Sequence, residues 1–155
     1  MVFHPPDRVP ALGHANSLFL AGGISGAGDW QSALAAELSA GGWNVLNPRR
    51  EHYDALDPNA LREQIRWEHD DLRASSAIAF WFPAEALCLI SLYELGSWAH
   101  WRDAVTGAPK PLFVGAHPDY TRRDNILIQL ELERPDVTVV DSLDGLRSQL
   151  WLAIP

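Results

Sequence analysis

The chain has 155 residues, of which 47% are hydrophobic, and it includes seven tryptophans. This length and composition fit one folded domain whose core needs no disulfide or metal, and they argue against a disordered chain. The formal net charge of −8 argues against a nucleic acid polymer as partner, because such binding needs a basic surface. A single nucleotide stays possible, since one phosphate can be held by a helix N-terminus.

The cysteine content and the hydrophobic segments bear on where the protein works. The single cysteine, Cys88, cannot form an internal disulfide, which fits a reducing compartment. We see no signal peptide pattern at the start and no apolar run of the roughly 20 residues that cross a bilayer. We therefore expect a soluble, cytoplasmic protein that does not associate with membranes.

Short apolar segments alternate with helical patterns along the chain. Strands are expected at residues 17–21, 43–46, 77–82, 112–115 and 137–140. Helices are expected at residues 29–40, 59–74, from about 90 onward, 125–133 and 142–152, with a polar loop before residue 59. This alternation predicts a single α/β domain over residues 17–155, a doubly wound five-stranded parallel sheet with helices on both faces. Among the Rossmann-like arrangements we expect the flavodoxin-like strand order.

The first 16 residues differ from the rest. They contain three prolines and mixed polarity, so they are expected to form an irregular arm.

A glycine-rich loop follows the first expected strand. It begins at Gly22 and Gly23, and Asp29 is placed to cap the helix after it. Neither the dinucleotide-binding pattern nor the P-loop pattern can be laid on it. Its backbone amides and the hydroxyl of Ser25 can still cradle a sugar or a phosphate. The alternative is a plain tight turn between strand and helix.

Two carboxylates stand out against their surroundings. Glu68 lies between Ile65 and Leu72 on the stripe that Leu61 begins, and Glu94 lies near the start of the helix after strand 77–82. Glycosyl chemistry uses such a pair, one carboxylate at the anomeric carbon and a protonated one at the leaving group.

The same two carboxylates also have a purely structural interpretation. Glu68 can pair with Arg49 or Arg50, and Glu94 can be a charge favoured by the helix dipole.

Other reaction classes find little support. The six histidines show no metal-ligand spacing, and one cysteine cannot build a structural zinc site, so we expect no metal. There is no GxSxG elbow of a serine hydrolase. The missing dinucleotide pattern disfavours an NAD or flavin oxidoreductase, so no cofactor is expected.

Four motifs in order carry a resemblance to a known family. They are FLAGGIS near the start, WNVLNPRR at the second strand, QIRWEHDDL on the next helix and ISLYELGSW after the third strand. Together they resemble the nucleoside 2-deoxyribosyltransferase-like family, whose superfamily includes deoxynucleoside 5′-monophosphate N-glycosidases. The resemblance runs from about Leu18 to Gly115. It implies a flavodoxin-like fold and cleavage of a nucleoside or nucleotide at its N-glycosidic bond, with transfer to another nucleobase or to water.

The resemblance also implies roles for the carboxylates. Glu94 of the ELG motif matches the nucleophile that forms a covalent glycosyl intermediate, and Glu68 matches the acid that assists the base. The better-known members most often carry aspartate at the position of Glu68, and they often carry it at that of Ser76. The side chain of Glu68 is longer than that of aspartate. This changes its geometry toward the substrate but leaves its implied role as the acid that assists the base.

Further side chains are expected to bind the substrate. Trp30, Trp67 and Trp81 are candidate aromatic walls for the base, although each can equally belong to the core. Asn47 or Arg49 would read the base edge or a phosphate. Ser91, three residues before Glu94, is placed to meet a sugar hydroxyl or phosphate.

In the family, a loop from a neighbouring subunit often completes the site, which implies a homodimer or larger homo-oligomer. Residues 120–125, ending at Asn125, are the candidate loop, and a solvated helix start capped by Asp124 is the alternative. The competing function is a module that binds a nucleotide on the same fold without turning it over. Its sequence argument is weaker, since a pure binder gains little from two acids beside an anionic ligand.

Overall fold

The computed structural model describes residues 1–50 and 57–154, without the side chains of residues 11–13. The described strands are β1 (Val2–Phe3), β2 (Ser17–Gly22), β3 (Asn44–Leu46), β4 (Ala77–Phe82), β5 (Leu112–Ala116) and β6 (Val139–Val140). The described helices are the 3-10 helix η1 (Ala11–Asn16), α1 (Trp30–Gly41), α2 (Ala60–Ala74), α3 (Leu89–His100), α4 (Arg123–Glu133) and α5 (Leu143–Leu152). Most of the polar loop expected before α2 lies outside the described residues.

The strands form one parallel sheet in the order β1-β3-β2-β4-β5-β6. If the five predicted strands are numbered along the chain, this order reads 2-1-3-4-5, with β1 added at the edge. The flavodoxin-like order is therefore confirmed. β2 and β4 pair at the centre, and the chain crosses from one side of the sheet to the other between them. Ligands of doubly wound sheets bind at the carboxyl ends of such strands.

The N-terminal arm contributes more structure than predicted. Val2 and Phe3 pair in parallel with Val45 and Leu46, and η1 connects this edge strand to β2. A two-residue strand beside prolines has too little alternation to be recognised in a sequence. At the opposite edge, β6 is shorter than expected and contains only Val139–Val140.

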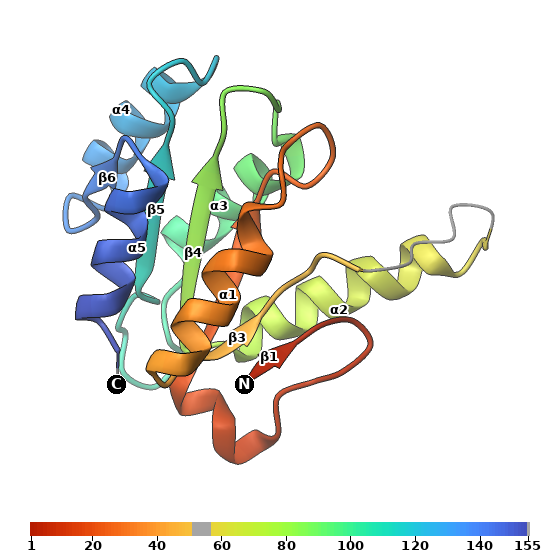
Figure 1. Cartoon of the computed structure of the whole chain (residues 1–155). Helices are drawn as coiled ribbons and strands as arrows, with labels where there is room; N and C mark the ends of the chain where they lie inside the picture. The colour runs from red at the N-terminus through yellow and green to blue at the C-terminus, as the bar shows by residue number, and fades with distance from the viewer. Residues whose placement is uncertain (51–56, 155) are drawn as a thin grey trace.

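Helices cover both faces of the sheet, as Figure 1 shows. α1 and α5 lie on one face, where Leu34, Leu38, Leu146 and Leu150 pack on alternate residues of the strands. α2, α3 and α4 lie on the other face. Their buried side chains meet Phe19, Ile78, Phe80, Phe82 and Val114 of the sheet. Strand residues alternate between these two cores, as the pleat of a sheet buried on both faces requires.

The apolar stripe predicted on α2 is only partly correct. Leu72 is buried, but the side chains of Leu61 and Ile65 are 59% and 56% exposed. The first half of α2 projects beyond the edge of the sheet (Figure 1), so these residues have no sheet surface to pack against. Trp67 and Asp71 supply most of the buried face instead.

The helices bear on membrane association as well. Within residues 1–50 and 57–154, none of them is both long and apolar enough to cross a bilayer.

Candidate active site

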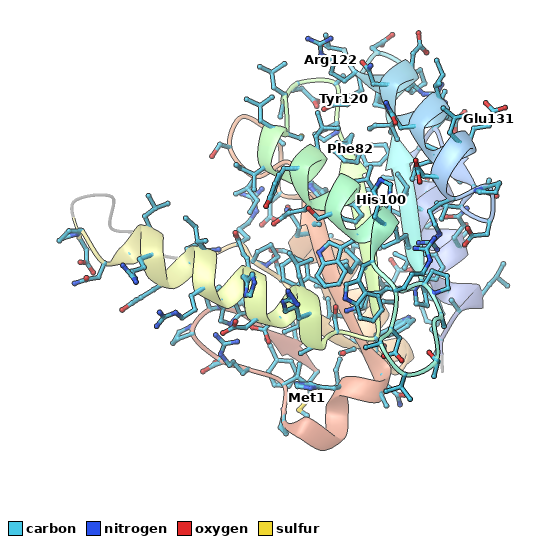
Figure 2. The ribbon with its side chains drawn as sticks, turned by 180° about the vertical axis from the view of Figure 1, so that it is seen from behind. Met1, Phe82, His100, Tyr120, Arg122 and Glu131 are labelled. Carbon is cyan, nitrogen blue, oxygen red and sulfur yellow. The ribbon has the colours of Figure 1, made fainter. Side chains whose placement is uncertain are left out.

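A groove of about 500 Å³ lies between α2 and α3 and contains both predicted carboxylates. Figure 2 shows these helices side by side on the face that they share with α4. Glu68 enters the groove from α2 and Glu94 from α3. The apolar walls of the groove are Ile65, Leu72, Ile90, Tyr93, Trp98 and Trp101.

Glu94 is a partly buried carboxyl group whose ionised form is disfavoured. Burial raises its pKa to about 8, and the nearby charge of Glu68 adds to the rise. Because α3 begins at Leu89, Glu94 is in the second turn, beyond the first turn where the helix dipole acts most strongly. A surface carboxylate stabilised by that dipole would have a lowered pKa, so the helix-start interpretation does not fit.

Glu68 is held by a hydrogen-bonded neighbour. Gln64, one turn earlier on α2, donates from Nε2 to Glu68 Oε1 at 2.8 Å and to the carbonyl of Pro48 at 2.9 Å. The other end of this amide, Oε1, accepts a hydrogen bond from Arg50. Burial raises the pKa of Glu68, against the opposing effects of Gln64 and Arg50. Gln64 was not recognised from the sequence, although its i,i+4 spacing from Glu68 was a usable signal.

The predicted alternative partners of Glu68 are engaged elsewhere. Arg49 forms an ion pair with Asp29 at 3.1 Å, and Arg50 reaches Glu68 only through Gln64. Within the described residues, no direct ion pair joins Glu68 to either arginine. The groove therefore contains two partly buried carboxyl groups that repel each other, and their protons titrate as those of a coupled pair.

The glycine loop is a tightly fixed turn at the carboxyl ends of β2 and β4. Gly22 has φ of 145°, and a Cβ there would lie 2.2 Å from the carbonyl oxygen of Trp81. Gly23 donates its amide to the same carbonyl at 3.3 Å. Asp29 caps α1 as predicted, accepting from the amide of Ser32. Ser25 is exposed at the loop surface, where its predicted contact with a ligand remains open.

Arg49 holds this loop from inside. Its guanidinium donates to Gln31 Oε1 at 3.2 and 3.3 Å and to the carbonyls of Ile24 and Gly28. With Asp29 also paired to it, the side chain is committed to the loop and does not line the groove. The role of Arg49 in reading a base or phosphate stays a prediction.

Two other predicted binding residues, Asn47 and Ser91, do not line the groove. Asn47 is fully buried, and its Oδ1 accepts from the amide of Arg49 at 3.0 Å. Its Nδ2 has no hydrogen-bond partner within the described part of the chain. Ser91 is buried in the first turn of α3. Their binding roles stay predictions.

The three tryptophans predicted as aromatic walls do not line the groove. Trp67 is buried in the core, where its ring lies 5.8 Å from that of Phe19 and its indole donates to the carbonyl of Asp7. Trp30 and Trp81 belong to the core on the opposite face of the sheet, and together they line a different pocket of about 300 Å³. The aromatic residues of the groove are Tyr93, Trp98 and Trp101. All three lie within or beside the ELG motif. Trp98 and Trp101 follow Glu94 by four and seven residues, a helical spacing that could have identified them.

Asn125 lies away from the carboxylates of its own chain. It lines a smaller pocket between α3 and α4, on the far side of α3 from Glu94. The segment before it is anchored by Tyr120, whose hydroxyl donates to the carbonyl of Leu87 at 2.7 Å. α4 begins at Arg123, so Asp124 lies inside the helix and is not its cap. A contribution of this segment to a neighbouring subunit remains a prediction.

Comparison with known protein families identifies the family of the chain. The sequence profile of a family described as nucleoside 2-deoxyribosyltransferase like matches residues 15–112, more than half of the chain. The chain belongs to this family. A search among curated proteins found no match. The region matched to the deoxyribosyltransferase-like family includes Glu68, Glu94 and the glycine loop, whereas Asn125 lies beyond it.

The groove also bears on metal binding. Within residues 1–50 and 57–154, no three His, Cys, Asp or Glu side chains are arranged to hold a metal ion. In this deoxyribosyltransferase-like protein, Glu68 and Glu94 are the acidic side chains that line the groove, and His69 and Arg73 line it as well.

Proposed function

We propose that the protein cleaves the N-glycosidic bond of a (deoxy)nucleoside or its 5′-monophosphate through a covalent glycosyl intermediate on Glu94. The observation that carries the proposal is the pair of partly buried carboxyl groups facing one groove, with the pKa of Glu94 raised to about 8 and that of Glu68 also raised. Membership of the deoxyribosyltransferase-like family supports the same reaction class.

The first step breaks the bond to the base. An oxygen of ionised Glu94 attacks C1′ of the sugar and forms an ester bond, while the C1′–N bond breaks and its electron pair goes to the base nitrogen. Protonated Glu68 gives its proton to the departing base. Gln64 donates to Glu68 Oε1, so the transferable proton is expected on Oε2.

The second step releases the sugar. A nitrogen of a second nucleobase, or a water molecule, attacks C1′ and displaces the Glu94 carboxylate, while Glu68 takes the proton of the attacking group. Two inversions at C1′ give net retention of configuration. Transferase and hydrolase differ only in this acceptor. The aromatic side chains of Tyr93, Trp98 and Trp101 offer apolar surface against which a base can pack.

The competing function is a module that binds a nucleotide without turning it over. The repulsion between Glu68 and Glu94 argues against it, because keeping two such groups partly buried is costly and brings a binder of anions no gain. We also propose, from family membership, a homodimer or larger homo-oligomer in which residues 120–125 approach a neighbouring site. The molar mass in solution, measured by light scattering, tests this assembly.

The decisive experiment is chromatographic detection of free base. A panel of deoxyribonucleosides and their 5′-monophosphates is incubated with the protein, with and without an added acceptor base. We expect base release by the natural protein and at least about a thousandfold slower release by Glu94→Ala, because the nucleophile is gone. Dependence of the rate on the acceptor base distinguishes transferase from hydrolase.

Glu131→Ala is the matched control, since Glu131 is exposed on α4, away from the groove. It should leave base release unchanged. Equal release by Glu94→Ala and the natural protein would exclude Glu94 as nucleophile. A nucleotide that binds and is recovered intact from every reaction would favour the binding module.

A further inference from the structure

A buried lysine connects the two helices that present the carboxylates. Lys110, which precedes β5, is only 5% exposed. Its ammonium donates to the carbonyls of Leu72 and Arg73 at 2.6 and 2.8 Å, in the last turn of α2. The same nitrogen lies 4.4 Å from the ring centroid of Trp98 on α3. Within the described residues, no carboxylate pairs with it.

The two contacts lie at equivalent places relative to the site. Leu72 is four residues after Glu68, and Trp98 is four residues after Glu94. Residues four apart lie one above the other on a helix. Lys110 therefore contacts each helix about one turn beyond the carboxylate that this helix carries. Leu72 and Trp98 also line the groove.

Lys110 is itself held firmly. Prolines flank it on both sides, and the carbonyl of Pro111 accepts from the amide of Ile78 in the central strand β4. The carbonyl of Lys110 accepts from Arg134 at 3.2 Å. Arg134 in turn forms two hydrogen bonds of 2.8 Å with Asp136. The ammonium thus extends from a point fixed to the sheet.

The position of α2 makes this anchor important. Its first half projects past the sheet (Figure 1), so its last turns must fix its position against α3. The Lys110 ammonium caps carbonyls in the last turn of α2 and also faces the indole of Trp98 on α3. Lys110 therefore contacts both helices at once.

We propose that Lys110 is a positioning residue that sets the separation of Glu68 and Glu94 by fixing the last turn of α2 against α3. It touches neither the substrate nor the reacting atoms. A wider separation would weaken the repulsion between the two carboxyl groups and admit water. Both changes would lower the pKa of Glu94 from about 8 toward its ordinary value.

Lys110→Met tests this role, since methionine keeps much of the apolar stem but loses the ammonium. The pKa of the Glu94 carboxyl is measured by NMR in the ligand-free protein, by titration to both sides of its value of about 8. Burial and Arg73 lower the pKa of Lys110 to about 8, so the natural side chain is charged over the lower part of this titration. Glu68→Gln is the reference, because it removes the charge of Glu68 that raises the pKa of Glu94. We expect the pKa of Glu94 in Lys110→Met to be as low as in Glu68→Gln, or lower. In Lys110→Arg, which keeps a cation at this position, the pKa of Glu94 should stay close to that of the natural protein.

Arg102→Met is the matched control. Arg102 donates to the carbonyls of Ala99 and Trp101 at the end of α3 but is not bonded to α2. The variant Arg102→Met should lower the thermal stability of the protein and leave the pKa of Glu94 unchanged. If Lys110→Met does not fold, Trp98→Leu removes the contact on the α3 side and should give the same fall.

The activity measurement depends on the proposed function, whereas the NMR measurement does not. For base release, Lys110→Met should lower kcat by about tenfold or more with little change in KM, because a small misplacement of catalytic groups acts on the chemical step. An unchanged Glu94 pKa in folded Lys110→Met, or in Trp98→Leu if Lys110→Met does not fold, would overturn the positioning role and leave Lys110 a helix cap. Loss of the proposed function alone would appear as no base release by the natural protein, with the Glu94 pKa still shifted by Lys110→Met.

Discussion

The proposed reaction requires the two groove carboxyls to share one proton. Attack needs ionised Glu94, and departure of the base needs protonated Glu68. Burial and mutual repulsion raise the pKa of Glu94 to about 8, and burial raises the pKa of Glu68 as well. At neutral pH the pair therefore retains a proton, and the larger rise in pKa places it mainly on Glu94 in the ligand-free protein. The reactive form is the singly protonated pair in which this proton has moved to Glu68.

This sharing predicts a bell-shaped dependence of kcat/KM on pH. With both groups protonated there is no nucleophile, so activity should rise with pH through a value above the ordinary 4.5 of glutamate. Above about 8 both groups are ionised and no acid remains, so activity should fall. The measurement uses an uncharged nucleoside, whose own ionisation does not interfere.

Glu68→Gln separates the two limbs. With a nitrophenyl-type leaving group that needs no proton, this variant should stay active and lose the alkaline limb. Its remaining limb should report the ionisation of Glu94 at a lower pH than in the natural protein, because the charge of Glu68 is gone. A flat profile between pH 5 and 9 for the natural protein would contradict the shared proton.

Among the elements, the unexpected strand β1 allows a test of its contribution to the free energy of unfolding. Val45 donates its amide to the carbonyl of Met1 at 2.8 Å, and Asn47 donates to that of Phe3 at 2.9 Å. The double variant Val2→Ala, Phe3→Ala should lower the free energy of unfolding by about 1 to 3 kcal/mol through lost burial. Urea unfolding measures this change. Val105→Ala, at a side chain that is 93% exposed, should leave the midpoint unmoved. An equal midpoint in both variants would mean that β1 adds no stability.

The main elements of the fold were predictable because their signals are local. Buried strands such as β4 are continuous apolar runs, and Asp29 before α1 is a recognisable cap. The failures depend on tertiary structure. Leu61 and Ile65 have helical spacing, but α2 extends past the sheet there and leaves them in solvent. Val2 and Phe3 form strand β1 only through pairing with the edge of β3, which is a tertiary contact.

The site was predictable only in part, for the same reason. The resemblance selected Glu68 and Glu94, and the structure brings both to one groove. Which tryptophans line that groove depends on how α2 and α3 pack, which the sequence does not state. Gln64 and Pro48 belong to two of the four motifs, but their contact, like that of Lys110 with the end of α2, depends on tertiary packing that no motif states.

For the whole molecule, the position of Glu94 implies a loss of stability at neutral and alkaline pH. Its pKa is about 8 in the folded protein and near 4.5 in an unfolded chain, so between these values the folded state binds more protons. Stability from this group is complete below pH 4.5 and is lost as pH rises toward 8. Residues kept for chemistry often have such a cost.

Glu94→Gln should therefore be more stable than the natural protein, and increasingly so from pH 5 to pH 8. At 1.36 kcal/mol per pKa unit the full shift corresponds to about 5 kcal/mol, which solvent access should reduce to on the order of 2 kcal/mol at pH 8. Urea unfolding at several pH values measures the difference, with Glu131→Gln as the control expected to follow the natural protein. If Glu94→Gln and the natural protein lose stability in parallel over this range, Glu94 is not the buried acid that the groove requires. If the difference widens with pH while base release disappears, one side chain both limits the stability of the protein and carries its reaction.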